Sequence, residues 1–212
     1  MFAMKTKYFK LLTSASFLIL LLVSACHSGS KDSTAFADSA NRQQIAANDS
    51  AGKAQIKSSD SAITANKNLQ NDASKFLVKS YESGLYEVQL SQLAATNALD
   101  PDVKNLALTL VSAHTAINAK IGKIADDARF ILPNGLNADH QKDLQDISKL
   151  SGADFYKKYV NTIISGHEQS ISNYKDAYKD LPDSYTKTFA AETLPKIEDH
   201  LSMAQKVSKR IK

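Results

Sequence analysis

Three of the five histidines in the chain occupy positions where a helix would bury them. His114, His167 and His200 each continue a run of apolar residues spaced three or four apart, which is the repeat of one face of an α-helix. Glu87 takes the equivalent position on a fourth, less apolar face. One ligand-type side chain per helix is the pattern that a polar or metal site inside a four-helix bundle leaves in a sequence.

Imidazole and carboxylate groups together suit borderline divalent metal ions. The sequence therefore predicts a site for a divalent transition metal, with zinc, copper, nickel and iron as the candidates. A di-iron site of the ferritin type requires an acid three residues before a histidine on two helices. None of the three histidines has one, which disfavours that chemistry. The predicted ligands are Glu87, His114, His167 and His200.

A second interpretation uses the same four side chains without a metal. Their distances from the predicted helix ends place them within roughly 10 Å of one level, at a rise of about 1.5 Å per residue. At one level they also fit a hydrogen-bonded network that fixes the packing of the helices. Small residues nearby leave room for an ion, a water or a ligand. These residues are Ser83, Gly84, Ala113, Gly166 and Ala204.

Turn and capping residues mark four long helices between residues 71 and 212. Asp100 followed by Pro101 starts the second helix, and Ser151 with Asp154 resembles a capping box at the start of the third. Pro182 stands between the third and the fourth. About 22 residues join the two hairpins, and a short extra helix is predicted there at 138–149. The expected fold is all-α, a ferritin-like four-helix bundle with a long helix 2 to helix 3 connection; a simple up-down bundle is the alternative.

Residues 1–25 have the features of a lipoprotein signal peptide. Three lysines precede an apolar run at 11–23 that is shorter than a membrane-spanning helix. The run ends in Val-Ser-Ala-Cys, which resembles a bacterial lipobox and predicts cleavage before Cys26 and lipidation of this residue. The alternative is ordinary cleavage after Ala25. Cys26 is the only cysteine, so an intramolecular disulfide is excluded.

Residues 26–70 hold the predicted lipidated cysteine and then a disordered linker. Small and polar residues dominate this stretch, and large apolar side chains are scarce. As a random coil it would reach roughly 35 to 40 Å from a membrane surface. Within this disordered linker, a transient helix at 41–54 is possible. Removing the three lysines of the signal peptide lowers the net charge from +4 to +1, because 23 basic residues then face 22 acidic ones. No nucleic-acid binding is therefore predicted.

The ordered part of the chain resembles the bacterial domain of unknown function 4142 family, whose members are often described as outer membrane proteins. The resemblance covers residues 73–207 and implies a ferritin-like helical fold on an exported protein, without an established activity. In that family an aspartate commonly precedes the first two histidines, whereas this chain has Ala113 and Gly166. The motifs that carry the resemblance include Glu87-Val88-Gln89-Leu90, His114-Thr115, Ser151-Gly152-Ala153-Asp154-Phe155, His167-Glu168, Leu194-Pro195 and His200-Leu201-Ser202-Met203-Ala204.

These observations together predict an exported protein held in the cell envelope by a lipid anchor. His27, which follows Cys26, is not the aspartate that retains some lipoproteins at the inner membrane, and this favours the outer membrane. The predicted function is binding of a metal ion or small ligand at the Glu/His site in the bundle core. The alternative is a non-enzymatic structural or stress-related envelope protein. An enzyme is the third option, since the chain has neither a nucleophile elbow nor a phosphate loop.

Overall fold

The computed structural model describes residues 32–53, 60–182 and 184–211. This part of the chain contains six α-helices and no strand. None of these helices is both long enough and apolar enough to cross a membrane. The predicted signal peptide and Cys26 lie outside the described residues. The helices are α1 (Ser33–Lys53), α2 (Asp60–Asn97), α3 (Pro101–Ala128), α4 (Ala138–Ser148), α5 (Gly152–Asp180) and α6 (Tyr185–Ser208).

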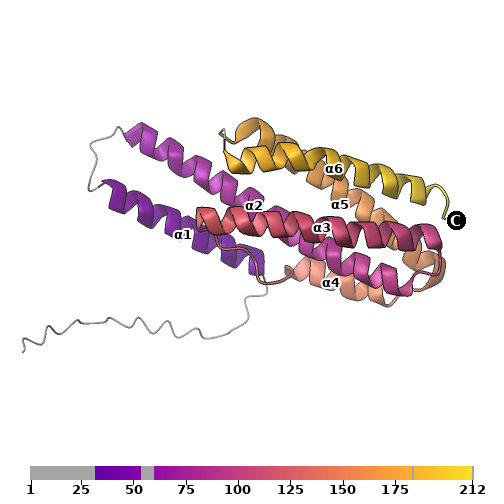
Figure 1. Cartoon of the computed structure of the whole chain (residues 1–212). Coiled ribbons are helices and arrows are strands. Elements are labelled where there is room, and N and C mark those ends of the chain that lie inside the picture. Colours follow the sequence, from indigo (N-terminus) through magenta and orange to yellow (C-terminus); the bar gives the residue numbers. More distant parts are fainter. Residues whose placement is uncertain (1–31, 54–59, 183, 212) are drawn as a thin grey trace, which may run out of the picture.

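Four long helices, α2, α3, α5 and α6, form two hairpins that pack against each other (Figure 1). Short connections join α2 to α3 and α5 to α6, and most of the contacts between helices lie within these two pairs. The pairs meet through contacts of α2 with α5 and of α3 with α6. The connection between the hairpins carries α4, which contacts α2 and α5. This arrangement confirms the predicted all-α, ferritin-like bundle with a long connection between its second and third core helices.

Local sequence signals explain most helix ends. The Asp100 side chain caps α3, since its Oδ1 accepts hydrogen bonds from the backbone N–H groups of Asp102 and Val103 at 2.9 and 3.0 Å. Arg129 ends the same helix in the left-handed conformation, at φ 59°. The capping box predicted at Ser151 does not form, because this side chain makes no cap hydrogen bond and the next residue, Gly152, has a φ of 55°. A residue in that conformation cannot continue a regular first turn.

Two apolar clusters fill the bundle, one toward each end. The first is built mainly where α2, α3 and α5 meet beside α4, and the second lies toward the turn between α5 and α6. Because the bundle is long and narrow, a layer of other side chains can separate the two. The first apolar cluster includes Leu90, Val103, Leu110, Phe155, Tyr159 and Ile163. The second includes Phe76, Leu77, Ile117, Ile121, Tyr174 and Ile197.

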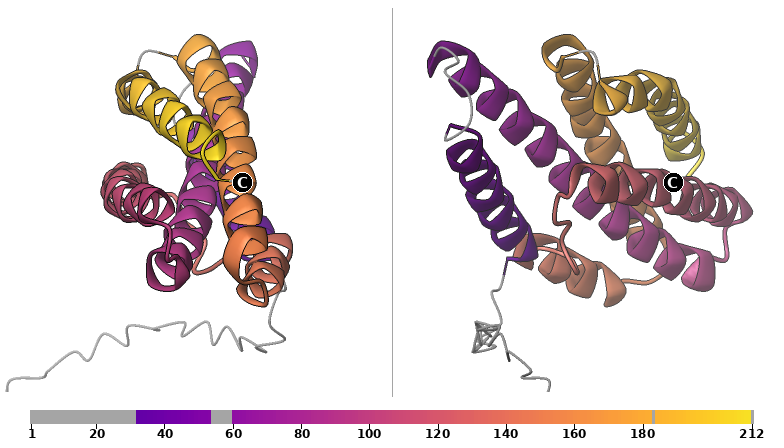
Figure 2. Two further views of the ribbon diagram at one scale, coloured as in Figure 1. Left: turned by 90° about the vertical axis from the view of Figure 1, so that its right-hand side faces the viewer. Right: turned by 60° about the vertical axis from the view of Figure 1, so that its left-hand side comes forward.

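The N-terminal helix α1 corrects the prediction of a disordered linker over 26–70. Residues 33–53 form a helix that runs beside the N-terminal part of α2, outside the four core helices (Figure 2). Helix α2 itself begins at Asp60, so the folded domain starts before the predicted residue 71. The remaining linker residues, at 26–31 and 54–59, lie outside the described part of the chain.

Three residues spaced four apart explain why α1 docks despite its polar composition. Ala37, Asn41 and Ile45 are buried, and this spacing puts them on one face of the helix. The Asn41 amide pairs with the backbone of Ile131, donating to its carbonyl at 2.9 Å and accepting from its N–H at 2.7 Å. Ser33 donates to the carbonyl of Gly135. The composition argument missed this because a narrow buried face suffices when a polar residue on it bonds to a neighbouring loop.

Candidate metal centre

The four predicted site residues come together in the layer between the two apolar clusters. Glu87 is on α2, His114 on α3, His167 on α5 and His200 on α6, and all four are buried. On each of the last three helices, the histidine separates residues of the first apolar cluster from residues of the second. The helical repeat causes this, since each histidine continues an apolar face that packs on both sides of it. We call these four residues the histidine centre.

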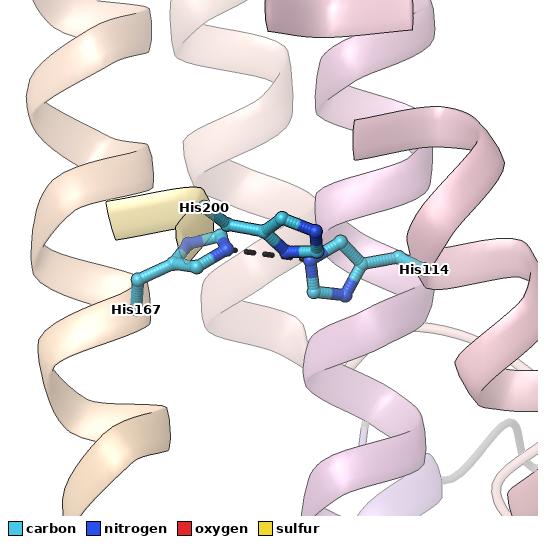
Figure 3. Close-up of side chains that lie close together, drawn as sticks. All are labelled: His114, His167 and His200. Atoms are coloured by element: carbon cyan, nitrogen blue, oxygen red, sulfur yellow. Dashed lines mark hydrogen bonds between the residues drawn. The ribbon is translucent and has the colours of Figure 1, made fainter. Parts of the chain in front are cut away.

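The three imidazole rings converge on a common point (Figure 3). His114 Nε2 and His167 Nε2 are 3.3 Å apart. One ring nitrogen from each of the three histidines lies within 4.8 Å of the other two. The ring centroids are 5.2 to 5.5 Å apart, and the rings are tilted or perpendicular to one another rather than stacked. Three imidazoles in this arrangement can hold a metal ion.

Glu87 lies behind two of the histidines instead of beside them. Its Oε2 is 2.8 Å from His114 Nδ1, and its Oε1 is 3.2 Å from His167 Nδ1. The second of these nitrogens also lies 2.9 Å from the carbonyl oxygen of Ile163. Carbonyl and carboxylate oxygens only accept hydrogen bonds, so both Nδ1 atoms carry a hydrogen and donate it. The Nε2 atoms that face each other therefore present lone pairs when the rings are neutral.

The charges in the centre follow from burial and from these contacts. Burial alone would raise the pKa of Glu87, but the neighbouring histidines, His114 first and then His167, outweigh it and lower the pKa to about 2. Burial lowers the pKa of His167 and lowers that of His200 to about 4. At neutral pH the centre therefore contains a carboxylate and at least two neutral imidazoles. Among the ion pairs of the described residues, Glu87 has only histidines as partners.

His200 is the member with unused bonding capacity. It is 6% exposed, and in the described structure its buried Nδ1 makes no hydrogen bond. A buried polar atom without a partner costs about 1 to 3 kcal/mol, so native proteins seldom keep one without a reason. One ring nitrogen of His200 lies within 4.8 Å of a ring nitrogen of each of the other two histidines.

Two of the predicted small residues make the close approaches in this layer feasible. A Cβ atom at Gly84 would lie 2.1 Å from Oδ1 of Asn118, so only glycine lets this side chain of α3 reach α2. A Cβ atom at Gly166 would lie 3.3 Å from Glu87 Oε1. Glycine at position 166 therefore places no side chain against this carboxylate oxygen.

Sequence reasoning missed a second polar cluster next to the histidine centre. Glu82 on α2 is buried, and both of its carboxylate oxygens lie 2.9 Å from His140 Nδ1 on α4. The backbone N–H of Asn137 donates to the same carboxylate at 2.9 Å. His140 stacks on Tyr86, with ring centroids 4.1 Å apart and an angle of 3° between the rings. The Tyr86 hydroxyl hydrogen-bonds to Asp143. We call Glu82 and His140 the α4 pair.

The one feature of the sequence that could have predicted the α4 pair is Glu82 itself. It stands five residues before Glu87, which turns it about 140° around α2 and away from the bundle interior. A carboxylate buried there needs partners from another element. His140 lies in a polar segment whose tertiary neighbours the sequence alone does not give.

An all-α bundle with a buried layer of histidines defines the class of this protein. A model of the family described as a domain of unknown function (DUF4142) matches residues 58–207. Since this is more than half of the chain, the protein belongs to that family. The match begins close to the start of α2, which agrees with the earlier domain boundary seen in the structure.

The fold is similar to the crystal structure of a DUF305 fragment from Deinococcus radiodurans. The TM-score is 0.59 at 10% sequence identity, and the similarity covers 66% of this chain and 96% of that fragment. At this identity the similarity extends to the fold alone. A comparison with curated proteins gives no match.

Proposed function

We propose that this protein is an exported, lipid-anchored binding protein whose bundle holds a divalent transition metal at His114, His167 and His200. The role of Glu87 is to fix the hydrogen on Nδ1 of His114 and to offset the charge of the ion. Carboxylates commonly act in this way behind metal-bound histidines. The function is binding, and no catalytic step is assigned.

The separation of the two Nε2 atoms is the observation that carries this proposal. Two nitrogens bound at about 2.0 to 2.1 Å to a tetrahedral zinc ion lie about 3.3 to 3.4 Å apart. His114 Nε2 and His167 Nε2 are 3.3 Å apart, and the acceptors beside the two Nδ1 atoms, Glu87 for His114 and the Ile163 carbonyl for His167, hold both rings in the required tautomer. A shift of His200 toward this pair would complete a three-histidine set, since its ring nitrogen already lies within 4.8 Å of theirs.

The competing function is structural, and the same 3.3 Å contact favours it if one ring carries an extra proton. A protonated His114 would donate from Nε2 to His167 Nε2 and pair with the Glu87 carboxylate on its other side. The centre would then be a hydrogen-bonded network that sets the packing of the four helices. This alternative leaves Nδ1 of His200 without a partner.

Melting curves of the full chain, purified in detergent without an affinity tag, separate the two functions. If the centre binds metal, added zinc or copper should stabilise the protein relative to a chelator. The increment is about 2.7 kcal/mol, or roughly 5 to 10 °C, at a free metal concentration about a hundred times the dissociation constant. Replacing His114 or His167 with glutamine should remove this increment while the helical circular dichroism spectrum is retained.

His140→Gln is the matched control, because it removes a histidine that lies outside the proposed ligand set. This variant should keep the full metal-dependent increment. A structural network predicts a different pattern: His114→Gln and His167→Gln would lower stability by about 1 to 3 kcal/mol with or without metal. Identical wild-type curves in chelator, zinc and copper would refute metal binding.

The anchor is a separate part of the proposal and rests on Cys26 within the Val-Ser-Ala-Cys sequence. Lipid on this residue would supply the membrane affinity, with the outer membrane as the proposed location. Cys26→Ser should shift the protein from the detergent phase to the aqueous phase in phase partitioning and release it from membranes. Unchanged partitioning of the variant would show that the protein is not lipidated.

A further inference from the structure

The histidine centre is buried, so an ion must reach it through one of the surface hollows beside it. One hollow of about 610 Å³ opens between α2, α4 and α5, and its lining includes Glu87 and Gly166. A second hollow, of about 420 Å³, is lined by α6 residues and includes His200. Each hollow touches a different member of the centre. The two are therefore alternative entrances.

The charges of the two linings differ in sign. The hollow between α2, α4 and α5 has four carboxylates and two lysines in its lining, a formal charge of −2. Its carboxylates belong to Glu82, Glu87, Asp139 and Asp143. The hollow on α6 has two lysines and one carboxylate, that of Asp199, a formal charge of +1. A lining of negative charge raises the local concentration of cations and speeds their association.

Glycine at position 166 keeps the inner end of the negative hollow accessible. A Cβ atom there would lie 3.3 Å from Glu87 Oε1, so a larger side chain would stand between the hollow and this oxygen. The same carboxylate contacts Nδ1 of both His114 and His167. An ion at Glu87 is on the Nδ1 side of His114 and His167, so one of these two rings must turn aside before the ion meets the Nε2 lone pairs.

We infer that a hydrated divalent cation enters the histidine centre through the hollow between α2, α4 and α5, with Gly166 as the opening and Glu87 as the first inner contact. This inference rests on the proposed function, because it assigns an entrance to the same metal centre. It adds two functional residues of different kinds. Gly166 acts by the space that it leaves, and Asp139 acts by charge at the outer rim.

The test measures the rate of Co²⁺ binding by stopped-flow absorbance, on the full chain in detergent after treatment with a chelator. Gly166→Val should slow association and dissociation by the same factor, about tenfold or more, because a narrowed entrance raises the barrier in both directions. The dissociation constant and the visible spectrum of bound Co²⁺ should stay unchanged. A changed spectrum at an unchanged association rate would overturn the role of Gly166.

A pair of charge reversals tests the entrance without altering its inner end. Asp139 and Asp199 are both exposed, and each lies in the lining of one hollow. Asp139→Lys should slow Co²⁺ association about threefold at low ionic strength and less in high salt. Asp199→Lys is the matched control and should leave the rate unchanged.

Each outcome bears on the proposal. If Asp199→Lys slows binding and Asp139→Lys does not, the ion enters along α6 and the inference is wrong. If the wild type binds Co²⁺ but Gly166→Val and Asp139→Lys both bind at the wild-type rate, the inference fails while the proposed function stands. If the wild type binds no Co²⁺, zinc or copper, both are refuted.

Discussion

The histidine centre and the α4 pair both place a buried carboxylate of α2 against a histidine, yet they differ in how completely their polar atoms are bonded. Glu82 accepts hydrogen bonds from His140 and from the backbone of Asn137, and His140 also stacks on Tyr86. In the histidine centre, Glu87 uses both oxygens on Nδ1 atoms. The Nε2 atoms of His114 and His167 lie 3.3 Å from each other, and Nδ1 of His200 makes no hydrogen bond in the described structure.

This difference bears on the proposed function, because a structural polar cluster and a binding site satisfy their polar atoms to different degrees. A cluster that exists only to fix packing gains from satisfying every buried donor and acceptor, as the α4 pair nearly does. A ligand site must keep some atoms free for the ligand, which costs stability in its absence. The α4 pair ties α4 to α2, whereas the histidine centre leaves Nδ1 of His200 without a hydrogen bond, as the proposed binding site would require.

The largest expected effect is the response of the histidine centre to acid. The pKa of His200 is lowered to about 4 by burial, and that of His167 is lowered for the same reason, so the unfolded chain takes up protons below about pH 6.5 that the folded chain does not. The contribution of the two neutral histidines to the free energy of unfolding is therefore fully present above about pH 6.5, and it is lost as the pH drops toward 4. The slope is about 1.4 kcal/mol per pH unit for each histidine kept neutral.

Urea unfolding between pH 7 and 4, with chelator throughout, measures this slope. The lowered pKa of Glu87 acts in the same direction but at lower pH, since its stabilising charge is lost only toward pH 2. His200→Leu should reduce the slope, because the folded chain then holds one fewer neutral imidazole. An unchanged slope in this variant would mean that His200 is protonated in the folded protein.

The next effect concerns the α4 pair. Glu82→Leu keeps the approximate size of the side chain but leaves Nδ1 of His140 and the N–H of Asn137 without their acceptor. Breaking a pair of this kind should cost about 2 to 4 kcal/mol, less than for a fully buried pair because the His140 side chain is 30% exposed. Urea unfolding at pH 7 in chelator gives this value.

The control for this variant is Glu168→Leu, which makes the same change at an exposed position of α5. It should alter stability by no more than about 0.5 kcal/mol. If Glu82→Leu also fell within that range, the α4 pair would not stabilise the domain, and its contrast with the histidine centre would disappear.

The smallest expected effect is on the stability of a His200→Leu variant, which should not fall as it does in the Glu82→Leu variant. His200→Leu replaces a buried ring with an unpartnered nitrogen by an apolar side chain, so in chelator it should leave stability unchanged or raise it by about 1 kcal/mol. The same variant should lose the stabilisation by zinc. Melting curves in both conditions measure the two effects, and a loss of 2 kcal/mol or more in chelator would show that His200 is part of a satisfied packing network.

Much of the architecture followed from the sequence because its signals are local. The 3.6-residue repeat put His114, His167 and His200 on buried faces, and Asp100 with Pro101 marked the start of α3 as the structure has it. Each of these depends on residues within a few turns of one helix, so no knowledge of distant contacts was required. The same repeat brought Glu87 into the layer of the three histidines.

Contacts between residues distant in the sequence decided the rest. Asn41 docks α1 by bonding to Ile131, 90 residues away, which a composition argument for a linker could not include. Glu82 meets His140 across 58 residues. The position of Glu87 behind the rings, rather than among the proposed ligands, depends on how α2, α3 and α5 are rotated about their axes. Helical periodicity fixes which face of a helix is buried, and only packing fixes which atoms on that face meet.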